Sequence, residues 1–98
     1  MKIRLVDAAR HEFDEAIDYY SKHSGSAVTS FIDAFEKAKT RLAAFPHAGA
    51  HIRPGSRRIL IKRFPYMLVY RIEGDHIVVY ALAHQRRRPG YWKKRLAP

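Results

Sequence analysis

Basic and aromatic side chains that could bind phosphates gather near the end of the sequence. His84 is followed by a glutamine and three arginines, Arg86 to Arg88, and then by Tyr91 and Trp92. Arginine pairs with phosphate oxygens, and tyrosine or tryptophan can stack on bases. The same side chains can also hold an acidic, aromatic-rich peptide through charge-assisted hydrogen bonds. This segment therefore predicts a binding surface for a polyanion, either nucleic acid or an acidic protein.

RNA cleavage is the reaction that these residue types could support. Attack by the 2′-hydroxyl needs a base, an acid and cations that stabilise the phosphorane. His84, Arg87 and Tyr91 could fill those roles. For His84 and Trp92, a purely structural role is as well supported by the sequence as a role in catalysis or binding. In that interpretation His84 caps a strand, and Trp92 packs the tail onto the body of the protein.

Other chemistries have less support in the sequence. His47 and His51 lie in a loop rich in proline and glycine with no obvious third ligand, so no metal site is expected. The chain has no cysteine and no glycine-rich phosphate loop, so no cofactor is expected. Four acids fall on the polar face of the first predicted helix, which indicates a solvated face rather than paired catalytic carboxylates. They are Glu12, Asp14, Glu15 and Asp18.

The net charge is concentrated in one part of the chain. The 98 residues carry 19 Lys and Arg against nine Asp and Glu, a net charge of +10. Residues 57–98 hold eleven of the basic residues and only two acids, so their net charge is +9. A charge that only kept the chain soluble need not be segregated in this way. The asymmetry favours an acidic partner or nucleic acid, and it adds four cations to the predicted binding residues: Arg58, Lys62, Arg63 and Arg71.

Hydrophobic periodicity predicts the elements of the first half. Residues 2–6 alternate as a short strand, and Asp7 is expected to cap a helix. Residues 24–26 should end this helix with a glycine and cap a second helix that runs to about Ala44. The buried face of the first helix is predicted to carry Phe13, Ala16, Ile17 and Tyr20. That of the second is predicted to carry Val28, Phe31, Ile32, Phe35, Ala38 and Leu42.

The second half has the pattern of a sheet. Residues 45–56 hold two prolines and two glycines and are expected to form a loop. Strands are predicted at 57–63, 66–72 and 77–83, the last apolar throughout and therefore covered on both faces. A basic tail with one short helical turn follows at 85–98. The predicted fold is α+β, β-α-α-β-β-β, with an antiparallel two-helix hairpin on an antiparallel sheet, as one domain over residues 1–98. No segment approaches the ~20 apolar residues of a membrane span, so we expect a cytoplasmic protein without a membrane partner.

Taken in order, the motifs resemble the RelE/ParE toxin superfamily over essentially the whole chain. The matching segments are residues 12–20, Phe31 with the helix that runs into Phe45-Pro46 and Gly49, Arg57-Arg58, residues 63–71, and His84 to Trp92 with Arg95 beyond. The resemblance implies a fold of the predicted kind and a toxin that is neutralised by a cognate antitoxin encoded beside it. That antitoxin, usually acidic in its toxin-binding part, would wrap over the basic sheet face and the helix hairpin.

The superfamily divides into two mechanisms. RelE-like members cleave mRNA in the ribosome, whereas ParE-like members inhibit DNA gyrase. The nucleases typically carry an arginine after the tyrosine that is Tyr66 here, and lysines on the preceding strand. This chain has Met67 at the first position and Arg58 and Leu60 at the others. A missing cation at the scissile phosphate would cost on the order of several kcal/mol of transition-state stabilisation, which weighs against nuclease activity. The resemblance is closer to the ParE or plasmid-stabilisation branch.

The sequence therefore predicts a non-enzymatic toxin that binds DNA gyrase and is silenced by an antitoxin. One alternative is a ribosome-dependent endoribonuclease that uses His84, Arg87 and Tyr91. Another is a plain nucleic-acid-binding module. The residues predicted to contact the antitoxin or the target are Arg58, Lys62, Arg63, Arg71, Arg86, Arg87, Arg88, Tyr91 and Trp92.

Overall fold

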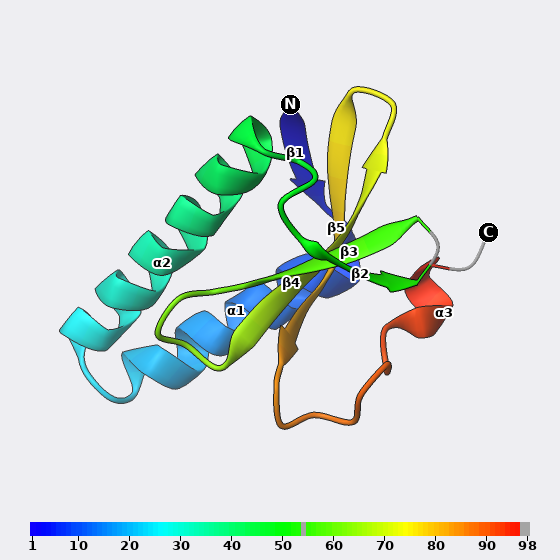
Figure 1. Ribbon diagram of the computed structural model, residues 1–98. Helices are drawn as coiled ribbons and strands as arrows, with labels where there is room; N and C mark the ends of the chain where they lie inside the picture. The colour runs from blue at the N-terminus through cyan, green and yellow to red at the C-terminus, as the bar shows by residue number, and fades with distance from the viewer. Residues whose placement is uncertain (54, 97–98) are drawn as a thin grey trace.

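The computed structural model describes residues 1–53 and 55–96. The elements are β1 (Lys2–Leu5), α1 (Asp7–Ser21), α2 (Gly25–Ala44), β2 (Ala50–Arg53), β3 (Ser56–Leu60), β4 (Tyr66–Glu73), β5 (His76–His84) and α3 (Lys93–Leu96). The antiparallel hairpin of α1 and α2 lies on one side of the sheet, and the chain after β5 loops round to α3 (Figure 1). This is the predicted α+β fold. Residue 54 of the expected loop and residues 97–98 of the expected tail lie outside the described residues.

The sheet is mixed rather than purely antiparallel, in the order β1-β5-β4-β3-β2. β1 runs parallel to β5, with Ile3 opposite Ile77, and every other pairing is antiparallel. The expectation of an antiparallel sheet was therefore wrong for its first strand. β5 lies between β1 and β4 and is buried along most of its length, as its apolar run predicted.

Two strand predictions need correction. β3 ends at Leu60 rather than at residue 63, because residues 61–65 turn and Arg63 takes a left-handed φ of 73°. The expected loop contains a short edge strand, β2, whose Ala50 and His51 pair with Arg58 and Arg57 of β3. Its four residues carry no periodicity that sets them apart from a loop, so the strand depends on its partner rather than on its own sequence.

The helix boundaries agree with the sequence except at their caps. The predicted cap of α2 within residues 24–26 is Ser24, whose hydroxyl accepts a hydrogen bond from the Ala27 amide at 3.0 Å. Gly25 is the first residue of α2 rather than the C-terminal glycine of α1, which ends in right-handed conformation at Lys22. Asp7 is likewise the first helical residue, not the cap. Val6 holds the cap position because its amide is bonded to Val79 of β5.

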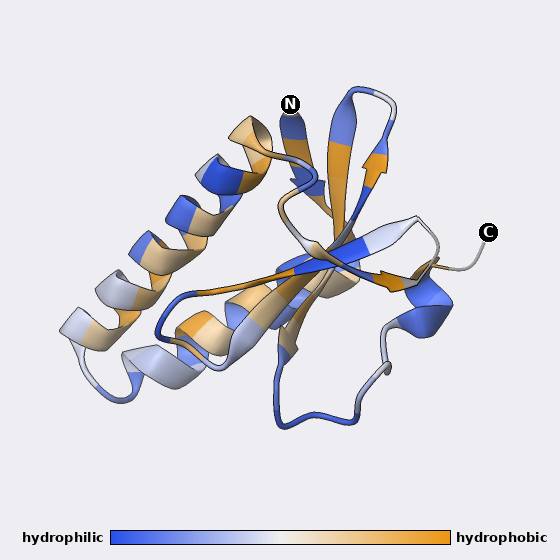
Figure 2. Cartoon of the chain, viewed as in Figure 1, coloured by the Kyte–Doolittle hydropathy of each residue, from blue (hydrophilic) through white to orange (hydrophobic). Residues whose placement is uncertain are grey.

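The main core lies between the helix hairpin and the sheet. Phe13 of α1 packs against Phe31 and Phe35 of α2, with ring centroids 6.0 and 4.5 Å apart. The predicted faces are confirmed for Ala16, Ile17 and Tyr20, for Phe31 and Phe35, and for Ala38 and Leu42; Val28 is half-buried. Ile32 is the exception, being 40% exposed. The apolar stripes of α1 and α2 are seen as orange on the sides that face inward (Figure 2).

The opposite face of the sheet is covered by the end of the chain. Val69, Ala81 and Ala83 point to this side and pack with Trp92 and Leu96 in a second apolar cluster. The predicted helical turn of the tail is α3. Within the described residues, none of the helices is long and apolar enough to cross a membrane.

The loop before β2 is held by one buried phenol and one arginine. The Tyr70 hydroxyl donates to the Pro46 carbonyl at 2.8 Å and accepts from the Gly49 amide at 3.0 Å. Arg57 donates to the carbonyl oxygens of His47 and Gly49 at 3.1 and 2.8 Å. This network leaves no room for a side chain at Gly49, where an added Cβ would lie 2.5 Å from the Tyr70 hydroxyl and 2.6 Å from the Arg58 carbonyl oxygen.

Gly49→Ala should therefore lower the free energy of unfolding by about 1–3 kcal/mol, since the Arg58 backbone cannot yield easily. In a chain of this size each kcal/mol lowers Tm by about 4–8 °C, which a thermal melt followed by circular dichroism resolves. Gly25→Ala is the matched control, because nothing lies within 4 Å of its added Cβ. Equal melting temperatures for the two variants would contradict this account of the loop.

Candidate functional site

Glu12 of α1 lies at the point where α1, the end of β5 and the C-terminal segment meet. It is only 6% exposed. Its Oε1 accepts hydrogen bonds from the Leu82 amide at 3.1 Å and from Arg95 Nη1 at 2.8 Å. Its Oε2 accepts from the Tyr91 hydroxyl, from Arg87 Nη1 at 3.4 Å and from Arg95 Nη2 at 3.3 Å. We call these five residues the Glu12 cluster.

The prediction of a solvated acidic face was thus wrong for Glu12, although Asp14, Glu15 and Asp18 are exposed. The cause is the unequal length of neighbouring strands. β1 ends at Leu5, opposite Val79, whereas β5 continues to His84. The Leu82 amide therefore has no strand beside it on that edge, and the Glu12 carboxylate accepts its hydrogen bond instead.

The donors around the Glu12 carboxylate compensate the cost of burying it. Burying an unpaired carboxylate is very costly, but here two guanidinium groups and two neutral donors surround it. Burial, and then the hydrogen bond to Glu12, raise the pKa of Tyr91, so its hydroxyl remains a donor. The Arg87 guanidinium lies 3.9 Å from the centre of the Tyr91 ring, a cation–π contact that holds Arg87 in place.

His84 and Trp92, for which the sequence left a functional and a structural interpretation open, both make structural contacts. His84 Nδ1 accepts a hydrogen bond from the Arg86 amide at 3.0 Å and so caps the end of β5. Trp92 is 5% exposed and packs against Val69 and Ala81. The indole N–H finds no hydrogen-bond partner in residues 1–53 and 55–96, so the indole is held by packing.

His84 and Arg87 share a cleft of about 350 Å³ between α1 and the end of β5. Glu12, Glu15 and Tyr66 also line this cleft. Burial raises the pKa of Tyr66 to about 12, so its phenol is neutral near pH 7. Tyr66 and Glu12 were not among the predicted site residues. In the sequence, Glu12 has the pattern of a solvated acid on a helix and Tyr66 that of an ordinary strand residue. Neither pattern indicates a functional site.

A second hollow, the tail groove, lies on the side of the sheet that the C-terminal segment covers. Its volume is about 710 Å³. Arg58, Arg87 and Lys93 bring positive charge to it, and its lining is mainly apolar. Met67 and Leu60 are part of that apolar lining, at the positions where the nuclease resemblance would have required cations.

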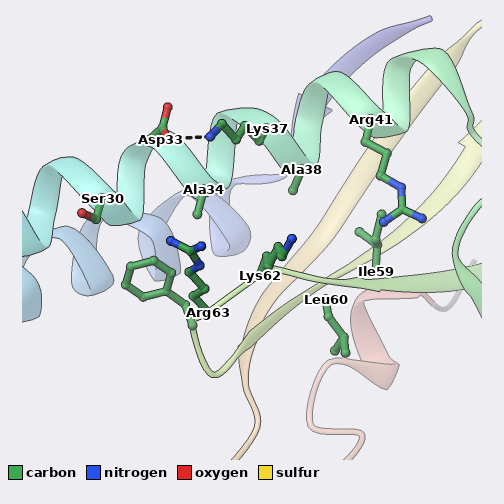
Figure 3. A pocket seen from close by; sticks show the side chains of 11 residues that line it. Ser30, Asp33, Ala34, Lys37, Ala38, Arg41, Ile59, Leu60, Lys62 and Arg63 are labelled. Atoms are coloured by element: carbon green, nitrogen blue, oxygen red, sulfur yellow. Dashed lines mark ion pairs between the residues drawn. The ribbon is translucent and has the colours of Figure 1, made fainter.

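A third hollow, the helix groove, lies between α2 and the turn after β3 and has a volume of about 370 Å³. Arg41, Lys62 and Arg63 line it (Figure 3), and its apolar lining includes Ile59 and Phe64. One acid also lines it, Asp33, and Lys37 pairs with that carboxylate at 3.1 Å. The groove therefore has an excess of positive charge.

The predicted binding residues consequently occupy several places rather than one surface. Lys62 and Arg63 line the helix groove, and Arg58, Arg87 and Trp92 line the tail groove. Tyr91 is in the Glu12 cluster. Arg71 is half-buried on β4 beside Tyr80, away from both grooves. Arg86 and Arg88 are exposed on the segment after β5. Within the described residues, no three His, Asp or Glu side chains gather as a metal site would require.

This fold, with a basic segment fastened across a mixed sheet, is that of small toxins from type II toxin–antitoxin systems. The family model described as the ParE toxin of the parDE type II toxin–antitoxin system matches residues 3–89. The chain therefore belongs to the ParE toxin family, which confirms the resemblance to the ParE branch. A structure from the chromosomal ParDE system of P. aeruginosa superposes with a TM-score of 0.73 at 19% identity, over 86% of this chain and 95% of that one. No curated protein sequence matches the chain.

Glu12→Gln should lower the free energy of unfolding by about 3 kcal/mol, because an amide group would face donors where a carboxylate accepted them. Trp92, the single tryptophan, should show red-shifted fluorescence as the C-terminal segment loosens. Glu15→Gln is the matched control, since Glu15 is an exposed acid on the same helix and its loss should change stability by less than about 0.5 kcal/mol. Denaturant unfolding followed by circular dichroism and fluorescence would measure both effects. Identical curves for the two variants would show that the cluster does not hold the segment.

Stability should also fall at alkaline pH. The pKa of Tyr66 rises from 10.0 to about 12 on folding, and those of Tyr20, Tyr80 and Tyr91 are raised as well. Between these pH values the unfolded chain releases phenolic protons that the folded protein keeps, so the free energy of unfolding decreases as pH rises. Tm measured from about pH 9 upward, with tyrosinate absorbance, checks this. Tyr66→Phe should flatten the dependence, and an unchanged slope would contradict the assignment.

Proposed function

We propose that this protein is the toxin of a type II toxin–antitoxin pair, that it is neutralised by direct binding of a cognate antitoxin, and that it inhibits DNA gyrase without cutting RNA. Membership of the ParE family supports the first part. The observation that carries the choice of mechanism is the state of Tyr91, whose hydroxyl is bound to the buried Glu12. A cytoplasmic location follows from such a target and agrees with the absence of cysteine.

The three residues that the sequence suggested for RNA cleavage make hydrogen bonds within the chain. The Tyr91 hydroxyl has a raised pKa and a carboxylate partner, so it is a poor proton donor to a leaving group. His84 Nδ1 already accepts a backbone amide. Met67 and Leu60 offer no charge to a scissile phosphate in the tail groove. These features favour binding over catalysis.

One feature favours the alternative, a ribosome-dependent endoribonuclease. His84, Arg87 and the Glu12 and Glu15 carboxylates line the same small cleft. A base, an acid and a cation are therefore close together, although not through the trio of His84, Arg87 and Tyr91 that the sequence suggested.

Induced expression in a bacterium should stop DNA synthesis before protein synthesis and induce the SOS response. Pulse labelling of DNA, RNA and protein measures the order of these events, and a supercoiling assay with purified gyrase tests the target directly. Co-expression of the protein encoded beside this chain should restore growth. Early loss of translation with cleaved messages would replace gyrase inhibition by the nuclease alternative.

Replacing Arg86 and Arg88 by glutamine should reduce growth inhibition at least about tenfold if these exposed cations contact the target, a loss equal to about 1.4 kcal/mol of binding. The double variant should fold normally because neither side chain belongs to the Glu12 cluster. Arg10→Gln with Lys22→Gln removes the same charge from exposed positions on and next to α1 and serves as the control. Equal growth inhibition by both double variants would remove the Arg86–Arg88 segment from the target surface.

A further inference from the structure

Phe45 is the most exposed large apolar side chain in residues 1–53 and 55–96. It lies where α2 ends and the chain turns toward β2 (Figure 1). Its side chain is 66% exposed, whereas Phe31 and Phe35 of α2 are buried in the main core. Aromatic residues are enriched at the buried centres of protein interfaces. A phenyl ring that stays in water at this position offers such a contact to another molecule.

The backbone on both sides of Phe45 is held by hydrogen bonds. The Phe45 amide donates to the Arg41 carbonyl at 2.8 Å, and the Phe45 carbonyl accepts from the Ala48 amide at 3.0 Å. Residues 46–49 are fastened to the sheet by the buried hydroxyl of Tyr70. An exposed side chain on a fixed backbone loses less conformational entropy when it is bound. The loop therefore presents the ring in a preorganised position.

The surroundings of Phe45 combine apolar surface with positive charge. A hollow of about 580 Å³ lies beside the ring, and all of its lining falls within residues 41–48. Arg41 and His47 line it and are exposed, and no acid does. Arg41 forms no ion pair within the described part of the chain. Its charge is therefore available to a group from outside.

We propose that Phe45 is an anchor by which the toxin binds its target protein, inserted into an apolar pocket of that protein whose rim carries carboxylates. A single protruding ring on a fixed loop suits a preformed pocket of a folded protein, whereas an extended segment uses a groove that continues along several elements. The carboxylates are the complement of Arg41. Nucleic acid is a poorer match, because Ala44, Pro46 and Ala48 beside the ring offer no charge to phosphates. This inference rests on the proposed function, since it names the contact of the toxin with DNA gyrase.

Phe45→Ala should raise the toxin concentration that half-inhibits supercoiling by purified DNA gyrase at least about tenfold, as expected for the loss of an interface anchor. Ile32→Ala is the matched control and should leave that concentration unchanged, because Ile32 is an exposed apolar residue of α2 that does not line the hollow. The Tm of both variants should stay within about 4 °C of the wild type, since both side chains are exposed.

Tyr70→Phe tests the fixed backbone separately from the ring. The change removes the hydrogen bonds that Pro46 and Gly49 make with the phenol and leaves Phe45 in place. The half-inhibiting concentration should rise about two- to fivefold, because the loop then loses more entropy on binding. A cooperative melt checks that the variant is folded, and unchanged inhibition would overturn the role of the fixed loop.

Arg41→Gln tests the carboxylate rim. The half-inhibiting concentration should rise about threefold and depend less on salt than that of the wild type. Arg10→Gln removes an exposed cation of α1 and should leave both quantities unchanged. Equal effects of the two substitutions would overturn the assignment of charge at this position.

The outcomes separate this inference from the proposed function. Inhibition of gyrase that Phe45→Ala leaves unchanged would overturn the anchor and keep gyrase as the target. No inhibition by the wild type would refute both.

Two further titrations distinguish the target protein from other occupants. The full-length protein encoded beside this chain should bind Phe45→Ala as tightly as it binds the wild type, and a loss of that affinity would assign Phe45 to the antitoxin and overturn the inference. Linear duplex DNA alone, followed by fluorescence anisotropy, should likewise bind both proteins equally. A loss of DNA affinity as large as the loss of inhibition would assign Phe45 to nucleic acid and also overturn it.

Discussion

The buried carboxylate of Glu12 links parts of the chain that are far apart in sequence. It accepts hydrogen bonds from Leu82 of β5 and from Tyr91 and Arg95 of the C-terminal segment. A charged group at this depth is tolerated only while its donors stay in place, and each donor in turn depends on the carboxylate. The position of the whole C-terminal segment on the sheet follows from this contact and from the packing of Trp92.

The attachment of the C-terminal segment to the sheet restricts the conformations of cations in the basic half of the chain. Arg87 lines the cleft beside α1 and also the tail groove, and it is 53% exposed while its ring contact with Tyr91 holds it. A cation held in one conformation loses less entropy on binding than a cation on a free tail. Part of the charge in residues 57–98 therefore lies around two grooves, with Arg87 held in place, which suits recognition of a partner.

The sequence was sufficient for the order of all elements except β2 and for most of the core, because helical and strand periodicities depend on neighbouring residues. It was insufficient where burial or strand pairing depends on residues that are distant in sequence. Glu12 fell on a polar helix face, and its burial depends on groups 70 to 83 residues downstream. β2 exists through its pairing with β3, and the parallel direction of β1 is defined only by its pairing with the distant β5. The packing of Trp92 against Val69 and Ala81 likewise depends on residues distant in sequence.

The Tyr91 hydroxyl could act in catalysis only by giving up its structural hydrogen bond to Glu12. Tyr91 can help to hold the C-terminal segment only while its hydroxyl donates to Glu12, and it can transfer a proton only by leaving that carboxylate. Leaving would remove one donor from the buried Glu12 carboxylate and weaken the hold on Arg87. The same side chain therefore cannot serve both uses without cost to the fold. The same face also carries a set of cations and an exposed leucine, which are groups that can bind a partner without any such cost.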